Sequence, residues 1–433
     1  MKFLLIHYSF EYPTSPRAIR WRALVNYFIQ KDIFVDVVCA DFGSEYENKN
    51  IRNLIRIHRT RQILPVKMKR VLNRNQILNK KRDLIKKYFK IVLKRFYDIT
   101  WKKIYWPDSA CLWYFPALYR SIKLLRENDY DILITVAPPF TTHLIGLTIK
   151  KFIRLKIKWL ADYGDPFAFT EIMSFNNTRL YRNLNYLVES KVVHDSDLIS
   201  VTTDETRRLY LEKFKISDKK IFTAPPLISD FKYANDEIRI NWKEGIHCVF
   251  TGRFYKTIRN PDGMLKIFSL LINEHQKPIY LHIYGDTENV DDLINYYKEK
   301  LRSRLLVHGE VSKNIAEIAV NSADFLINIS NISKVQLPSK VIEYMSTGKP
   351  IINFSITEND ISSKILQNYP LHIIIRSNND PKYEAERLSQ FIIKNKGKKV
   401  SEKQLKEMVK PYLTSSVGEI YLKNIKRVIN PKH

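Results

Sequence analysis

The feature that most constrains the fold is an alternation of short, β-branched apolar runs with longer stretches of helical periodicity, which occurs twice along the chain. The strand candidates are residues 3–6, 34–38, 132–136, 158–161 and 198–201 in the first set, and 248–250, 280–283, 305–307, 325–329 and 350–353 in the second. Helical patterns such as 17–30, 178–194 and 340–346 lie between them. Because parallel strands need crossover connections, this alternation predicts parallel sheets covered by helices. Two sets, separated by residues 225–242, predict two doubly wound domains.

Composition agrees with two folded domains. The chain has 433 residues, of which 45% are apolar and 12% aromatic, and this excludes a disordered protein. The three cysteines, Cys39, Cys111 and Cys248, are odd in number and far apart, which argues against a disulfide framework or a CxxC zinc site and favours the cytosol. Thr202 and Glu205 have the spacing of a capping box, so a helix with Thr202 as its N-cap is predicted after residues 198–201.

No segment of the sequence reads as a membrane span or a signal peptide. The first ten residues meet His7 too early for a signal peptide and are predicted to form a β-strand. The charge-free stretch 132–149 contains Pro138, Pro139 and His143, so it predicts a strand, a turn and a helix.

The net charge of +27 predicts anionic partners: nucleic acid, a phospholipid surface or phosphorylated small molecules. Residues 67–103 carry 14 Lys and Arg against Asp83 and Asp98, with apolar residues recurring at helical spacing. This segment is predicted to be a basic amphipathic helix or helix pair that contacts an anionic membrane surface. A solvated helix packed on its own domain is the alternative.

Several catalytic motifs are absent. The sequence has no GxGxxG, GxxxxGK[ST], HExxH or GxSxG motif, which argues against Rossmann dehydrogenases, P-loop NTPases, zincins and α/β-hydrolases. The ten histidines are scattered without a ligand-like pair, so no protein-bound metal is expected.

Residues 250–261 carry the strongest local signal for a phosphate site. A strand candidate ends at Gly252, Arg253 follows at once, and Lys256 and Arg259 lie within six residues of it. Cations at the carboxyl end of a strand, next to a helix start, are well placed to hold a diphosphate. An ordinary surface loop is the alternative.

A second signal lies at residues 336–350. Lys340 and Glu343 are three apart on a short predicted helix that follows Pro338 and ends at Gly348. The cation suits phosphate, and the carboxylate one turn later suits a ribose diol. A plain i,i+3 ion pair is the alternative.

Together, Gly252-Arg253 and the later Pro-Ser-Lys-x-x-Glu-Tyr-Met-x-x-Gly-Lys-Pro resemble the donor half of GT-B glycosyltransferases, nearest the retaining glycosyltransferase family 4 (group 1) type. Residues 9–17, 137–139, 159–166 and 416–428 are similar to further family signatures. The resemblance implies an α/β fold with two Rossmann-like doubly wound domains, a cleft between them and a C-terminal crossover helix. Its domains would be an acceptor domain at 1–228, a nucleotide-sugar donor domain at 243–412, and a helix at 413–433 returning to the first domain.

The resemblance also implies roles for single residues. Arg253 and a second cation, Lys256 or Arg259, would neutralise the leaving diphosphate. Lys340 and the Ser339 amide would assist, and Glu343 would bind the nucleotide ribose. It further implies transfer with retained configuration, no bound metal, and no cofactor beyond the nucleotide sugar.

Three positions depart from the family pattern. Val335 stands where an acid often contacts the donor sugar, Ile258 is the residue five after Arg253, where a second cation is expected, and Ser15 replaces a common glycine. These departures leave open the donor sugar and the choice between Lys256 and Arg259.

On the acceptor side, Asp162 and Asp165 follow a strand candidate and are the predicted catalytic residues. Either would position or deprotonate the acceptor hydroxyl, or help to stabilise a cationic sugar. A turn or a helix cap is the alternative for an Asp-Pro pair. Ser15 and Arg17 are predicted to contact the acceptor. Arg17 and Arg20 would hold an acceptor phosphate or, alternatively, lie on the solvent face of the first helix.

These observations predict a hexosyl- or N-acetylhexosaminyl-type glycosyltransferase (EC 2.4 class), with a UDP-sugar favoured as donor. Its acceptor would be a lipid-linked or glycolipid hydroxyl in bacterial-type surface polysaccharide synthesis, such as lipopolysaccharide or capsule. The enzyme would be cytoplasmic and peripherally attached to the inner face of the membrane. Two alternatives stay open: a GT-B nucleotide-sugar epimerase and a basic nucleic-acid-binding protein, the latter without a supporting motif.

Overall fold

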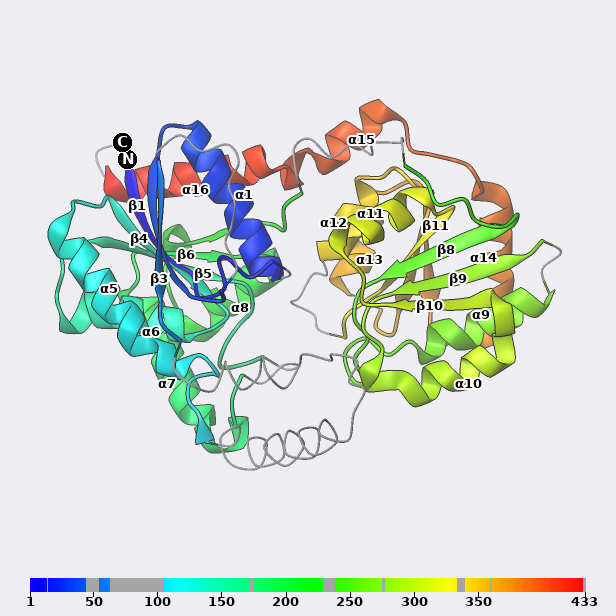
Figure 1. The fold of residues 1–433 in the computed structure, drawn as a ribbon, viewed down its shortest axis with the longest axis horizontal. Helices are drawn as coiled ribbons and strands as arrows, with labels where there is room; N and C mark the ends of the chain where they lie inside the picture. Colours follow the sequence, from blue (N-terminus) through cyan, green and yellow to red (C-terminus); the bar gives the residue numbers. More distant parts are fainter. Residues whose placement is uncertain are drawn as a thin grey trace, which may run out of the picture. The chain divides into compact units, whose positions relative to one another are not determined.

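The computed structural model describes residues 1–13, 15–43, 54–62, 104–170, 175–228, 238–274, 277–332, 339–358 and 360–430. The chain forms two compact units (Figure 1): unit 1 is Met1–Pro225 with Val417–His433, and unit 2 is Pro226–Ser416. The predicted basic segment 67–103 and Val335 lie outside the described residues. Among the described residues, no helix combines the length and the apolar character needed to cross a bilayer.

In its described part, unit 1 is built on a parallel sheet of seven strands in the order β3-β2-β1-β4-β5-β6-β7. The strands are β1 (Lys2–Ile6), β2 (Phe34–Ala40), β3 (Ile55–Thr60), β4 (Ile132–Ala137), β5 (Lys158–Tyr163), β6 (Leu198–Val201) and β7 (Ile221–Thr223). All residues of β4 are buried, as expected for a strand covered by helices on both faces. The strand order reverses between β1 and β4, the place where such sheets bind ligands.

The helices of unit 1 cover both faces of this sheet (Figure 1). They are α1 (Pro16–Gln30), α5 (Tyr114–Glu127), α6 (Thr141–Leu147), α7 (Thr178–Asp195), α8 (Asp204–Phe214) and α16 (Thr414–Ile429), with short turns of helix at Cys111–Trp113, Thr148–Phe152 and Asp218–Lys220. The layer formed by α5, α6 and α7 lies opposite α1, because their crossovers run in opposite directions across the sheet. The C-terminal helix α16 packs against α1, where the ring centroids of Tyr421 and Trp21 are 5.5 Å apart.

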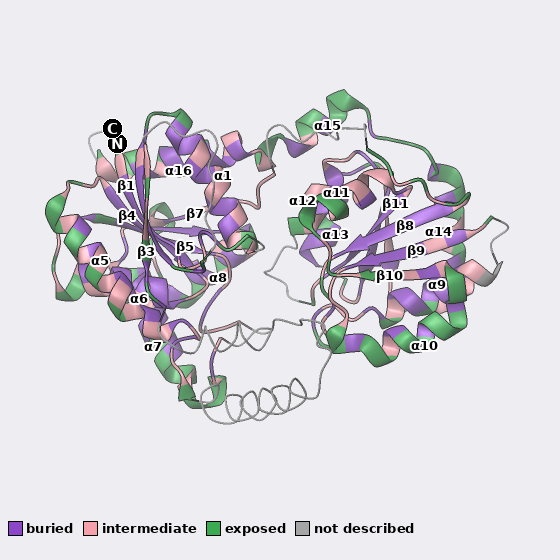
Figure 2. Ribbon diagram, in the orientation of Figure 1, coloured by how far each residue is buried: buried purple, intermediate pink, exposed green. Residues whose placement is uncertain are grey.

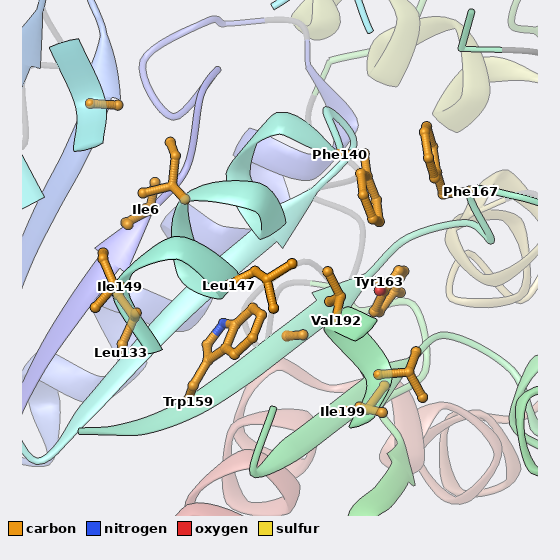
Figure 3. Packing of buried hydrophobic residues seen from close by; sticks show 14 of the residues in the cluster. Ile6, Leu133, Phe140, Leu147, Ile149, Trp159, Tyr163, Phe167, Val192 and Ile199 are labelled. Atoms are coloured by element: carbon orange, nitrogen blue, oxygen red, sulfur yellow. The ribbon is translucent and has the colours of Figure 1, made fainter. Parts of the chain in front are cut away.

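The core of unit 1 is fixed by large aromatic side chains (Figure 3). Trp159 of β5 lies against α6, and a Cβ added to Gly146 would come within 2.5 Å of its ring, so only glycine permits this approach. Phe140 and Phe167 stack with their centroids 3.9 Å apart. Their stacking packs the segment after β4 against the segment after β5.

Helix α8 begins one residue later than predicted. Its N-cap is Thr203, whose hydroxyl accepts from the Thr206 amide at 3.1 Å. The predicted cap, Thr202, instead donates to the Gly164 carbonyl at 3.2 Å. The prediction of Thr202 as the cap was therefore wrong, because its side chain serves a tertiary contact.

Unit 2 repeats the architecture with six described parallel strands in the order β10-β9-β8-β11-β12-β13. They are β8 (Ile246–Thr251), β9 (Ile279–Tyr284), β10 (Leu305–Gly309), β11 (Phe325–Ile329), β12 (Ile351–Ser355) and β13 (His372–Arg376). The helices are α9 (Asp262–Glu274), α10 (Asp291–Leu301), α11 (Lys313–Ser322), α12 (Ser339–Met345), α13 (Ile361–Leu366), α14 (Pro381–Asn395) and α15 (Glu402–Val409), with short turns of helix at Glu288–Val290, Arg302–Arg304 and Lys410–Tyr412. The strand order reverses between β8 and β11.

Candidate functional site

The carboxyl end of β8 is shaped by two glycines. The Gly252 amide donates to the Tyr284 carbonyl at 2.9 Å, and Gly252 has a φ of +148°. A Cβ on Gly285, whose φ is +143°, would lie 1.7 Å from the Gly252 carbonyl oxygen. Gly285 is therefore required for the backbone packing between the ends of β8 and β9, whereas Gly252 is favoured by its positive φ. The positions of the two glycines after strands are thus explained by backbone conformation and packing, with or without a bound ligand.

Arg253, the next residue, extends from this backbone contact between two acidic side chains. Its Nε is 2.8 Å from Asp286 Oδ2, and one terminal nitrogen is 3.0 Å from Glu310 Oε1. The Arg253 side chain is 49% exposed, so it is accessible to solvent. Partial burial lowers the pKa of Arg253, but the two carboxylates outweigh that and raise it. The result is an oriented, permanently charged guanidinium.

Of the two candidates for the second cation, the structure brings Arg259 to Gly252 and leaves Lys256 exposed. Residues 255–259 form a tight turn in which Tyr255 and Arg259 exchange backbone hydrogen bonds of 3.2 and 3.3 Å. This turn buries Ile258 and directs Arg259 inward, where one guanidinium nitrogen lies 3.5 Å from the position of a Cβ on Gly252. Arg259 is six residues after Arg253 and not five, but the turn still brings its guanidinium close to Gly252.

Only some of the hydrogen-bond donors of the Arg259 guanidinium have a partner. One terminal nitrogen donates to Asn331 Oδ1 at 2.9 Å, while its buried Nε has no hydrogen-bond partner. Burial lowers the pKa of Arg259 from its usual value, although a guanidinium stays charged at neutral pH. An unpaired buried donor is costly unless a ligand or water completes it, so this group suits an anion.

Helix α12 brings the second motif to the same strand end. The buried Tyr344 accepts a hydrogen bond from the Thr251 amide at 3.0 Å. Lys340 and Glu343 lie on another face of the helix, with Lys340 Nζ 2.5 Å from Glu343 Oε2. Burial lowers the pKa of Lys340, but the Glu343 carboxylate raises it above its usual value overall. Ser339, the first residue of α12, is exposed.

In unit 1, Asp162 at the carboxyl end of β5 is the centre of a buried network. Its Oδ1 accepts from Ser200 at 2.5 Å and from Tyr421 at 2.6 Å. Its Oδ2 accepts from Trp21 at 2.7 Å and is paired with Arg17. Burial would raise the pKa of Asp162, but the neighbouring arginines and these donors hold it below its usual value.

Four donors fill the acceptor positions of this carboxylate, and Asp162 is 1% exposed. The arrangement argues against the predicted role of Asp162 as a base and makes it an anchor that joins β5, β6, α1 and α16. Arg20 has a similar role, donating to the carbonyls of Ala224 at 2.8 Å and Pro225 at 2.6 Å. Neither Arg17 nor Arg20 lies on a solvent face, contrary to the alternative considered from the sequence.

The other predicted acceptor-side residues lie at the same edge. Asp165 is half-buried in the loop after β5. Ser15 is the N-cap of α1, with its hydroxyl 3.4 Å from the Ala18 amide and 3.1 Å from the Ser9 hydroxyl. This capping role accounts for a serine where a glycine was expected.

Sequence reasoning missed two histidines beside Asp162. His7 directly follows β1, and neither of its ring nitrogens is hydrogen-bonded. His143 of α6 bonds only through Nδ1, which is 2.7 Å from the Thr135 hydroxyl. Burial lowers the pKa of each to about 3, so both are neutral near pH 7. A histidine directly after the first strand was the available signal. Within the described residues, no group of three or more His, Cys, Asp and Glu is arranged to hold a metal ion.

The chain was compared with known protein families, curated proteins and solved structures. Residues 245–392 match the protein family described as glycosyl transferases group 1, whereas no curated protein matches the sequence. Similar solved structures include the apo form of the lipopolysaccharide outer core galactosyltransferase WaaB, with 12% identity, a TM-score of 0.60 and 100% of both chains covered. A glycosyltransferase from Rickettsia africae ESF-5 has 12% identity and a TM-score of 0.61, with 99% of this chain and 98% of that chain covered.

A third similar structure is a TarM mutant from S. aureus in complex with fondaparinux, alpha-GlcNAc-glycerol and UDP. It has 12% identity and a TM-score of 0.58, with 98% of this chain and 99% of that chain covered. At such identities the solved structures establish the fold alone. The predicted fold class and the resemblance are confirmed: the chain has the GT-B fold, and residues 245–392, which lie within unit 2, match the glycosyl transferases group 1.

Proposed function

We propose that this protein transfers a sugar from a nucleotide-diphosphate sugar, a UDP-sugar in the first place, to a hydroxyl of a lipid-linked or glycolipid acceptor. The observation that carries the proposal is the convergence of Arg253, Arg259 and α12 on the carboxyl end of β8, within the region that matches the family. Breaking a glycosyl–phosphate bond places negative charge on the leaving diphosphate. Cations held in position before the reaction stabilise that charge in the transition state.

Each donor-side residue has a separate role in this proposal. Arg253 and Arg259 bind the diphosphate from either side of Gly252, and Lys340 with the Ser339 amide adds a third contact. Glu343 accepts hydrogen bonds from the ribose diol. The preference for UDP is supported by TarM, a protein of similar fold whose structure contains UDP. The reaction would require no metal ion and would retain the anomeric configuration.

The acceptor would bind at the carboxyl edge of the unit 1 sheet. Asp165 is the proposed residue that positions or deprotonates the acceptor hydroxyl, and Asp162 acts through Arg17 as a positioning residue. The lipopolysaccharide galactosyltransferase WaaB has a similar fold, which supports a role in surface polysaccharide synthesis. A lipid-linked acceptor also fits the charge of +27, which favours a peripheral position on an anionic inner membrane face.

Nucleotide binding by the full-length protein tests the donor site. Isothermal titration with UDP, GDP, CMP and their sugars should give binding to one nucleotide class. Arg259→Ala should weaken that binding by at least about tenfold, since it removes a charge-assisted contact. The matched control is Lys256→Ala, which removes a neighbouring charge from the exposed side of the turn and should change binding little.

Two results would contradict the proposal. Equal losses in the Lys256 and Arg259 variants would mean that only net charge matters, and the absence of binding to every nucleotide would remove the donor site. Incubating the bound nucleotide sugar without acceptor supplies a further test, because an epimerised sugar would identify an epimerase instead.

A further inference from the structure

Helix α7 of unit 1 presents an apolar stripe to solvent. Leu180, Leu184 and Leu187 follow one another at helical spacing and are 61%, 41% and 49% exposed. These three residues form the α7 stripe. Exposed positions of α7 are green in Figure 2. Three adjacent exposed leucines on one helix face mark an interaction surface more often than scattered single ones.

The stripe is independent of the contacts that hold α7 in the fold. The opposite side of the helix is anchored by Asn185, which accepts from the Trp106 indole at 2.9 Å. It is also anchored by the buried Glu189, which accepts from the Tyr210 hydroxyl at 2.6 Å and from the Phe167 amide at 3.0 Å. The leucines therefore do not contribute to this anchoring, and their exposure calls for another explanation.

The charge around the stripe is of one sign. Arg179, beside the stripe, and Lys191, one turn after Leu187 and in line with it, are both exposed, and neither forms an ion pair with any described residue. Residues 178–188 contain no carboxylate, and the next acid along the helix, Glu189, is fully buried. An apolar face bordered by these cations is typical of a helix that lies in the interface of an anionic bilayer.

The stripe also lies near the edge where the acceptor is proposed to bind. Helix α7 follows the loop that carries Asp165, so its first turns lie near the carboxyl ends of the strands. Ile104, 59% exposed, is held beside these turns because the Tyr181 hydroxyl donates to its carbonyl at 2.6 Å. A membrane contacting this surface would bring a lipid-linked acceptor close to Asp165.

We propose that the α7 stripe, bordered by Arg179 and Lys191, is a docking surface for an anionic phospholipid bilayer. The inference rests on the proposed function only for its purpose, which is to present a lipid-linked acceptor to unit 1. The leucines enter the acyl boundary, and the two cations bind phosphate groups of the lipids.

A tryptophan reporter in the full-length protein tests the contact directly. Leu184→Trp places an indole in the stripe, and Ile393→Trp, on α14 of unit 2 and 69% exposed in the native chain, is the matched control. Vesicles of equimolar phosphatidylcholine and phosphatidylglycerol should shift the emission of the Leu184→Trp variant to shorter wavelength, and brominated lipids should quench it. The control should show neither change.

Co-sedimentation with the same vesicles measures the strength of the contact. Replacing all three leucines of the stripe by serine should reduce partitioning by at least about tenfold, since burial of apolar surface supplies the attachment. Replacing them by phenylalanine should preserve it. The double variant Arg179→Ala and Lys191→Ala should lose binding to the anionic vesicles and show little change on phosphatidylcholine alone.

Three results would overturn the proposal. Vesicle binding without an emission change at position 184 would assign attachment to another surface. An emission at position 184 that is already shifted before vesicles are added would show that the chain itself, or a second copy, covers the stripe. No binding of the wild-type protein to anionic vesicles would exclude docking altogether. Nucleotide titration of the same preparations tests the donor site separately, so failure of docking and failure of the proposed function are distinguishable.

Discussion

In unit 1 the carboxyl end of β5 is closed by a buried network around Asp162, whereas in unit 2 the carboxyl end of β8 presents a cation to solvent. Asp162 is 1% exposed and has four donors, while the Arg253 side chain is 49% exposed between two carboxylates. The two units share one topology, so the strand order alone does not decide which residues are available for chemistry. That depends on whether a neighbouring element, here α1 and α16, covers the strand ends.

The largest effect that we predict concerns Asp162. Asp162→Ala should lower the free energy of unfolding by about 3 to 5 kcal/mol, because it leaves Arg17 and the buried donors around it without their acceptor. Urea denaturation followed by circular dichroism measures the loss. Asp165→Ala is the control and should cost less than about 1 kcal/mol, since this residue is only half-buried.

The comparison would fail if the two aspartates behaved alike. A stable Asp162→Ala protein with a large loss of turnover would make Asp162 catalytic, as predicted from the sequence. A stable Asp165→Ala protein with reduced kcat would support Asp165 in that role.

A second prediction uses the neutral histidines of the unit 1 network. Burial lowers the pKa of His7 to about 3, against 6.5 for the free side chain. Because the folded pKa is the lower one, His7 adds full stability above pH 6.5, and this contribution is lost as the pH falls toward 3. His7→Leu removes the effect, so the wild-type protein should lose about 2 kcal/mol more than the variant between pH 7 and pH 5.

Urea titrations of both proteins at the two pH values supply the measurement. An equal pH dependence for wild type and variant would mean that His7 accepts a proton in the folded state and that this network is open to solvent. The contrast between the two strand edges would then be weaker than the structure indicates.

The same contrast explains what the sequence could predict. Periodicity located the two sheets because buried parallel strands are continuous apolar runs, as in β4 and β11. It missed β3, where Arg56, His58 and Arg59 interrupt the apolar pattern. This edge strand is held by tertiary contacts instead, including a pair of 2.8 Å hydrogen bonds from Arg59 to Glu11.

The site was predictable to a similar degree. Motif spacing pointed to Arg253, Lys340 and Glu343 as candidates, because the residues that make up each motif are close together in the chain. It did not separate Lys256 from Arg259, because a tight turn that buries one residue and exposes another leaves no periodic trace. Nor did it anticipate that Asp162 is satisfied by Tyr421, since that partner lies 259 positions away in the sequence.

The smallest predicted effect sharpens the unit 2 side of the comparison. Glu310 is 70% exposed and pairs with Arg253 at 3.0 Å, so its carboxylate occupies the guanidinium that the proposed diphosphate would contact. Glu310→Gln should therefore strengthen UDP binding by up to about fivefold, the range expected for an exposed ion pair. The control Glu288→Gln makes the same charge change at a nearby exposed position without contact to Arg253. Weaker UDP binding in the Glu310 variant alone would show that this carboxylate orients Arg253 and does not compete with the diphosphate for it. Equal changes in both variants would show that net charge alone causes the effect.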